Sequence, residues 1–153
     1  MASYGLNSVQ SVPLNQGAIF DTISGCPRGL VLHENQTATV ILRGIPFRPC
    51  QRVVKYKVTA ISNIALPEGA TIVPIGVALV SNGEVRPASL AISTPTAVLA
   101  YDNVTVSDII NVPVGCCFMV SIDNVVASDA DGYTPAPTIL MKNLNININR
   151  LDS

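Results

Sequence analysis

The side chains that could act as nucleophiles or general bases are few in this sequence. His33 is the single histidine, and it lies at the exit of an expected strand without a partner motif or a Gly-x-Ser-x-Gly turn elsewhere in the chain. One interpretation of His33 is half of a Cys–His nucleophilic pair, and the other is a surface histidine at a turn. The second is favoured, so the sequence predicts no catalytic residue and no enzyme.

The four cysteines are Cys26, Cys50, Cys116 and Cys117. They form no Cys-x-x-Cys pair, and a single histidine cannot complete zinc-ligand spacing, so we expect no metal and no other cofactor. Cys26 and Cys50 each lie beside a proline in a loop-like stretch, and they could form a disulfide. The alternative is four reduced thiols, which is favoured because no signal peptide marks the chain for an oxidising compartment.

The carboxylates lie mostly in turn-like contexts, where Asp is expected for backbone reasons alone. Residues 128–132 carry Asp129 and Asp131 in the alternating pattern of a calcium loop. They lack the downstream bidentate Glu and the remaining oxygen ligands, so a solvated loop is the favoured interpretation. The glycines are scattered and form no phosphate-binding or dinucleotide-binding motif.

A row of asparagines near the C-terminus is the strongest candidate for a binding surface. Asparagine can donate and accept hydrogen bonds without carrying a charge, and charged residues are depleted at interface centres. The row is therefore either a solvent-exposed edge of the sheet or a hydrogen-bonding ladder between subunits, and the second interpretation is favoured. We expect the same face to begin with two apolar residues, so the predicted interface residues are Ile139, Met141, Asn143, Asn145 and Asn147.

The composition also favours association between subunits. Hydrophobic residues make up 48% of the chain and charged residues only 12%, about half the usual share of charge. Such a surface is explained most simply if much of it is buried against other subunits. The 9 basic residues form no cluster in the sequence, and the formal net charge is -1, so a nucleic-acid partner is not expected.

The length of the apolar stretches and the composition of the N-terminus predict where in the cell the protein is made. No apolar stretch approaches the roughly 20 residues that a membrane-spanning helix requires. The first residues form neither a basic nor a continuous apolar region of a signal peptide. We therefore expect a protein without a membrane span that is made and assembled in a cytoplasm.

The elements that must position these side chains are strands. Helical periodicity is nearly absent, and short runs rich in Val, Ile and Thr alternate with Pro, Gly, Asn and Asp. Pro87 lies inside one run and marks it as an edge strand or a broken one. Two runs alternate clearly between apolar and polar residues, with the apolar residues at 54, 56, 58 and 60 and at 144, 146 and 148. The expected strands are 8–14, 18–23, 29–33, 37–43, 51–64, 72–80, 84–92, 98–110, 117–126 and 138–150.

This pattern predicts an all-β protein, an antiparallel sandwich of about ten short strands. The length is suited to one domain with a substantial core. Residues 1–16 are either an N-terminal arm or a first strand, and residues 17–153 form the single domain.

Two segments carry a resemblance to a known family. They are Leu-Pro-x-Gly-x-x-x-x-Pro-Ile at 66–75 and Val-Pro-x-Gly-Cys-Cys at 112–117, together with the closing asparagine-rich strand. In these segments the chain resembles small structural proteins encoded beside virion genes in phages and prophages of gut Firmicutes, over residues 17–150. Those proteins are similar to the trimeric jelly rolls of tumour necrosis factor and complement heads. This sequence departs from the complement and spore-surface relatives because it has no collagen-like stalk.

The resemblance implies a homotrimeric jelly roll that decorates a phage capsid or forms part of a head or tail fibre. Such a protein would be located in the virion, would contact other virion proteins and could meet a glycan of the host surface. One alternative is a secreted or spore-surface trimeric head domain. Another is a carbohydrate-binding or receptor-binding module, although aromatic residues at 5% and the absence of Trp give it little support.

Overall fold

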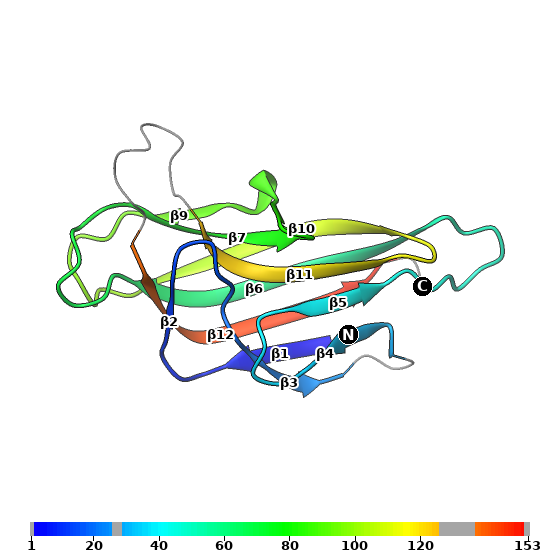
Figure 1. The fold of residues 1–153 in the computed structure, drawn as a ribbon, viewed down its shortest axis with the longest axis horizontal. Coiled ribbons are helices and arrows are strands. Elements are labelled where there is room, and N and C mark those ends of the chain that lie inside the picture. Colours follow the sequence, from blue (N-terminus) through cyan, green and yellow to red (C-terminus); the bar gives the residue numbers. More distant parts are fainter. Residues whose placement is uncertain (1, 26–28, 126–136, 152–153) are drawn as a thin grey trace.

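The computed structural model describes residues 2–25, 29–125 and 137–151. Two antiparallel sheets face each other, so the prediction of an all-β sandwich is confirmed (Figure 1). The first sheet has the order β10-β6-β12-β1-β3, with β2 also pairing with β12. Its strands are Asp102–Pro113 (β10), Val53–Ala65 (β6), Ile139–Arg150 (β12), Ala2–Leu6 (β1), Asp21–Ser24 (β3) and Gln10–Val12 (β2).

The second sheet has the order β4-β5-β11-β7-β8, with β9 also pairing with β7. Its strands are Val31–His33 (β4), Val40–Arg43 (β5), Cys117–Val125 (β11), Ile75–Ser81 (β7), Glu84–Val85 (β8) and Ala91–Ser93 (β9). A short 3-10 helix, Pro87–Ser89, separates β8 from β9 and has Pro87 in its first turn. The interruption expected at Pro87 is therefore confirmed, because proline cannot donate a ladder hydrogen bond. No helix in the described part of the chain is long and apolar enough to cross a membrane.

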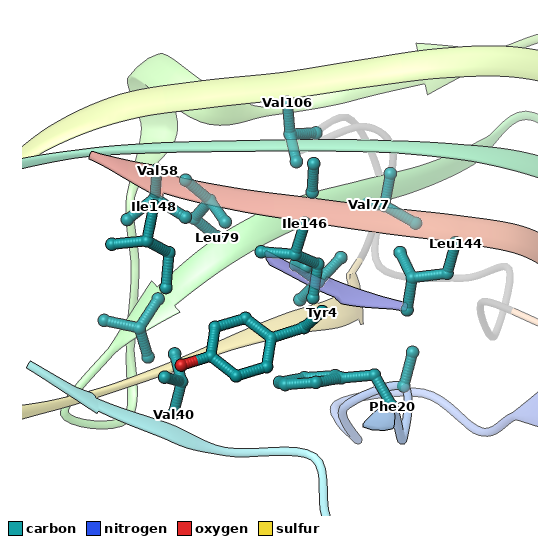
Figure 2. Close-up of a cluster of buried hydrophobic side chains, with 14 of the residues drawn as sticks. Tyr4, Phe20, Val40, Val58, Val77, Leu79, Val106, Leu144, Ile146 and Ile148 are labelled. Carbon is teal, nitrogen blue, oxygen red and sulfur yellow. The ribbon is translucent and has the colours of Figure 1, made fainter. Parts of the chain in front are cut away.

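The core lies between the two sheets (Figure 2). In β6, Val54, Tyr56, Val58 and Ala60 are buried, as their alternation predicts, and the lysines between them are exposed. The Tyr56 hydroxyl donates to the carbonyl oxygen of Arg43 at 2.7 Å, which satisfies the one polar atom that this ring brings into the core. Alternation along this strand thus corresponds directly to an inner and an outer face.

The alternation of β12 changes phase at a bulge. Leu144, Ile146 and Ile148 face the core, as predicted. The register against β6 shifts between Lys142 and Asn145, and Asn143 takes a positive φ of 52°. Two residues of β12 therefore oppose one residue of β6, which reverses the faces on either side of the bulge.

The bulge corrects one prediction about the asparagine row. Ile139 and Met141 are fully buried in the core of the subunit and point away from the face that carries the asparagines. The expectation that the two apolar residues begin the asparagine face is wrong, because strict alternation was carried across the bulge. Neither residue has surface available for a contact with another subunit.

Residues 1–16 contain the two strands β1 and β2. Both strands pair with β12 in the first sheet, and Leu14 then bridges to Asn124 of β11 in the second sheet. The described part of the chain forms twelve strands where the sequence predicted about ten. The excess arises because β1 was not singled out and because the run 84–92 divides into β8 and β9.

Candidate functional site

The outer face of the first sheet carries the asparagines, and the part of it around Asn143, Asn145 and Asn147 is called the asparagine face. On this face, Asn143 and Asn145 are exposed and Asn147 is half-buried. Cross-strand neighbours extend this face in rows. One row runs across five strands in the order Ser107, Thr59, Asn147, Ser3 and Ser24.

Hydrogen bonds join two pairs of side chains within this row. The Thr59 and Ser107 hydroxyl oxygens are 3.2 Å apart, and the Ser3 hydroxyl donates to Asn147 Oδ1 at 2.9 Å. Asn147 Nδ2 in turn donates to Asn145 Oδ1 at 3.3 Å. The side chains are thereby held in fixed positions, which reduces the entropy that an interface would have to remove on binding.

The next row of the asparagine face mixes polar and apolar groups. Asn145 lies between Ile61 of β6 and Gly5 of β1, and Thr105 follows beyond Ile61. Ile61 is 38% exposed, although it occupies the middle of a sheet. Ordered amides beside an exposed isoleucine have the mixed composition of a protein–protein interface centre.

His33 is held by two backbone carbonyl groups and two aromatic rings. Its Nδ1 lies 2.9 Å from the Thr39 oxygen, and its Nε2 lies 2.8 Å from the Phe20 oxygen. The ring stacks on Phe20 at a centroid distance of 4.2 Å and meets Tyr4 edge-on. Each ring nitrogen lies at hydrogen-bonding distance from a carbonyl oxygen, and the neutral imidazole donates to one of the two. His33 therefore links β4 to the segments that precede β3 and β5.

The cysteines do not assemble a reactive site in the described part of the chain. Cys50, Cys116 and Cys117 are exposed. Cys26 and the acidic residues of 128–132 lie outside the described residues, so four reduced thiols stay the favoured prediction and the Cys26–Cys50 disulfide its alternative. Within the described ranges, no group of three or more His, Cys, Asp or Glu side chains could hold a metal ion.

An open hollow of about 580 Å³ lies beside β8. Arg86, Asp108 and Phe118 contribute to its lining. Arg86 donates from Nε to Asp108 Oδ2, so these two charged groups of the lining satisfy each other. The hollow therefore presents an internal ion pair.

Asp123 is a half-buried carboxylate on the outer side of β11. Burial raises the pKa of the Asp123 carboxyl above its ordinary value of 3.8, and the hydrogen bond from the Ser121 hydroxyl, at 2.7 Å, opposes this rise. Gly17 bridges to Asp123 from the segment that follows β2. The carboxylate is thus covered by the N-terminal part of the chain.

We expect Asp123→Asn to raise the unfolding temperature near neutral pH. For a carboxyl whose pKa is raised on folding, the favourable contribution is complete below 3.8 and is lost as the pH rises through the folded-state pKa. Asparagine keeps an oxygen acceptor for Ser121 and carries no charge. Thermal melts of both proteins from pH 7 down to pH 3.5 should show the gain at pH 7 shrinking as the pH falls. A variant less stable than the parent at pH 7 would contradict this account.

No protein-family model and no curated protein matches the chain. The site must therefore be interpreted from its own geometry. The sequence analysis identified Asn145 and Asn147 but missed their neighbours Ser3, Thr59 and Ser107, because cross-strand rows depend on register between distant segments. The polar positions that alternate with the buried residues of β6 are the signal that could have pointed to Thr59.

Proposed function

We propose that the chain is a non-enzymatic structural protein of a bacteriophage virion that assembles as a homotrimer through the asparagine face. It decorates the capsid or forms part of a head or tail fibre, after assembly in the host cytoplasm. The observation that carries the association is the row of uncharged side chains through Asn147, where Ser3, Asn147 and Asn145 are joined by hydrogen bonds. The proposed location in a virion is based on the resemblance of residues 66–75 and 112–117 to virion-associated proteins.

The topology supports the jelly-roll part of this proposal. Apart from the short strands β8 and β9, the strands from β5 to β12 alternate between the second and the first sheet. Strands that cross between two facing sheets in this way are typical of paired Greek keys, of which a jelly roll is made. The two resembling segments lie at connections, since 66–75 leads from β6 into β7 and 112–117 joins β10 to β11.

The surroundings of the aromatic rings count against a carbohydrate-binding module. Sugar recognition of that kind needs an exposed ring face. The Phe47 ring is covered by the Arg150 guanidinium at 3.5 Å, and the Tyr101 ring lies under Lys142 Nζ at 3.9 Å. Tyr4, Phe20 and Tyr56 are buried. The structural role is therefore favoured over the glycan-binding one.

The trimer is tested with Asn145→Asp. A cyclic trimer that closes through this face brings three carboxylates together, and their repulsion should shift the protein toward monomers while each subunit stays folded. The Asn147 amide can still donate to an oxygen of the new carboxylate, so the hydrogen bond within the subunit is kept. Native mass spectrometry reports the oligomer and circular dichroism reports the fold.

The matched control is Asn35→Asp. It makes the same change of charge in the turn between β4 and β5, where Oδ1 of residue 35 accepts from the Thr22 amide at 2.8 Å. We expect this control to stay trimeric. A parent protein that is a stable monomer at micromolar concentration would refute the trimer. A fully trimeric Asn145→Asp protein would show that the asparagine row faces solvent and takes no part in the interface. Mass spectrometry of purified virions tests the setting.

A further inference from the structure

Folding gathers most of the positive charge of this chain at one end of the sandwich. This end, called the basic end, contains the loop 44–52, the first part of β6, the turn between β10 and β11, and the end of β12 (Figure 1). Register places these segments together, because Cys117 pairs with Arg43 and Arg150 pairs with Tyr56. Six of the eight described Lys and Arg residues lie here: Arg43, Arg48, Arg52, Lys55, Lys57 and Arg150.

The described acidic side chains lie elsewhere. Residues 43–57, 109–119 and 148–151 include no Asp or Glu, and Asp152, the next acid in the sequence, is outside the described residues. Arg52, Lys55 and Lys57 are exposed. In a protein with a formal net charge of -1, the described residues thus concentrate positive charge at one end, and such a concentration attracts and orients an acidic partner during encounter.

The backbone of the basic end is held firmly. The Gly44 amide donates to the Cys116 oxygen at 2.9 Å, and the Gly115 amide donates to the Gly44 oxygen at 3.0 Å. The Val114 amide donates to the Arg52 oxygen at 2.9 Å, which ties the turn between β10 and β11 to the start of β6. These bonds fix the backbone that carries the cations, so less conformational entropy of the loop is lost when a partner binds.

The chemistry of the basic end favours a protein partner over a nucleic acid. A single strand of nucleic acid needs aromatic faces on which bases stack. Phe47, the aromatic residue of the loop 44–52, has its ring face covered by Arg150. Arginines dominate the six cations and lie among Phe47, Pro49, Val53 and Pro113. Arginine with aromatic and apolar neighbours is the composition of protein interfaces, and its guanidinium pairs with carboxylates through two parallel bonds.

We propose that the basic end binds an acidic protein surface. The contact uses Arg52 and Lys55 as exposed cations and the loop 44–52 as a rigid platform. In the trimer proposed above, threefold symmetry places the three basic ends at the same level along the axis. They therefore form a ring that binds its partner with increased avidity. Only this increase, and not the binding itself, rests on the trimer.

The experiment measures binding of a fluorescent poly-L-glutamate peptide to the full chain by anisotropy. We expect Lys55→Glu and Arg52→Glu each to weaken binding by about tenfold at low salt, because each replaces attraction by repulsion at the contact. The matched control is Lys142→Glu, which makes the same change of net charge beside Tyr101, away from the basic end. We expect less than about a twofold change for the control, and weaker binding of the parent protein as salt rises.

Two results would overturn the proposal. Equal losses from Lys142→Glu and Lys55→Glu would mean that net charge alone drives binding. Tighter binding of a single-stranded oligonucleotide of equal charge would assign the basic end to nucleic acid. Native mass spectrometry of the parent protein and of each variant separates this proposal from the previous one, since a parent protein that is a monomer and still binds the peptide supports the basic end and refutes the trimer.

Discussion

Ile146→Asp is expected to prevent folding. Ile146 is 1% exposed in the middle of β12, and it lies opposite Tyr4 of β1 and Ala60 of β6. Figure 2 shows its side chain within the apolar cluster between the sheets. A carboxylate there has no partner, and burying an unpaired charge costs several kcal/mol, comparable to the roughly 5–15 kcal/mol that stabilises a whole domain.

The neighbouring position provides the control for Ile146→Asp. Asn145→Asp introduces the same carboxylate one residue away on the exposed face, and we expect its far-ultraviolet circular dichroism spectrum to match that of the parent. Ile146→Val should remain folded and lose about 1 kcal/mol, as a buried methylene does. A cooperative unfolding transition at the parental temperature in Ile146→Asp would show that β12 does not face the core in the way described.

Gly44→Ala is expected to have the second largest effect. A Cβ at Gly44 would lie 2.2 Å from the Pro113 oxygen and 3.1 Å from the Cys116 oxygen. Both are backbone atoms in the turn between β10 and β11, so no side chain can move to make room. The loop must separate from the turn and give up the paired hydrogen bonds between Gly44 and residues 115 and 116. We expect a loss of about 3 kcal/mol in the free energy of unfolding, measured by urea denaturation.

The control for Gly44→Ala is Gly25→Ala. A Cβ at Gly25 meets nothing within 4 Å, so the change in unfolding free energy should stay within about 0.5 kcal/mol. Equal stability of Gly44→Ala and Gly25→Ala would mean that the hydrogen bonds between Gly44 and the turn do not hold the loop 44–52 in place. Measuring poly-L-glutamate binding on both variants shows whether binding at the basic end depends on these hydrogen bonds.

Local patterns in the sequence were sufficient to predict much of the fold. The strict alternation through Val54, Tyr56 and Val58 predicted the inner face of β6 correctly. The same reasoning failed in β12 because one extra residue near Asn143 reverses the phase, and a bulge has no hydrophobic signature of its own. The strand β1 was not singled out, since Ala2, Ser3 and Gly5 are poor strand formers whose extended form comes from pairing with β12.

The candidate surfaces were harder to predict than the strands. The asparagine row was visible because its members alternate along one strand. Its partners come from β1, β6 and β10, which only the sheet register brings together. The basic end was missed because its cations are interspersed with apolar residues, although residues 35–67 contain five Lys or Arg and no acid. Acid-free stretches of this kind are the signal to look for.

The place of β12 between β1 and β6 has a consequence for biosynthesis. Ala2 pairs with Ile148, so the two strands that meet in the first sheet are synthesised at opposite ends of this sequence. A ribosome adds roughly 5–20 residues per second. During those seconds the apolar faces of β1 and β6 have no neighbour between them. The sheet therefore closes only once translation has passed Arg150, and until then the unpaired edges of β1 and β6 can pair with other chains.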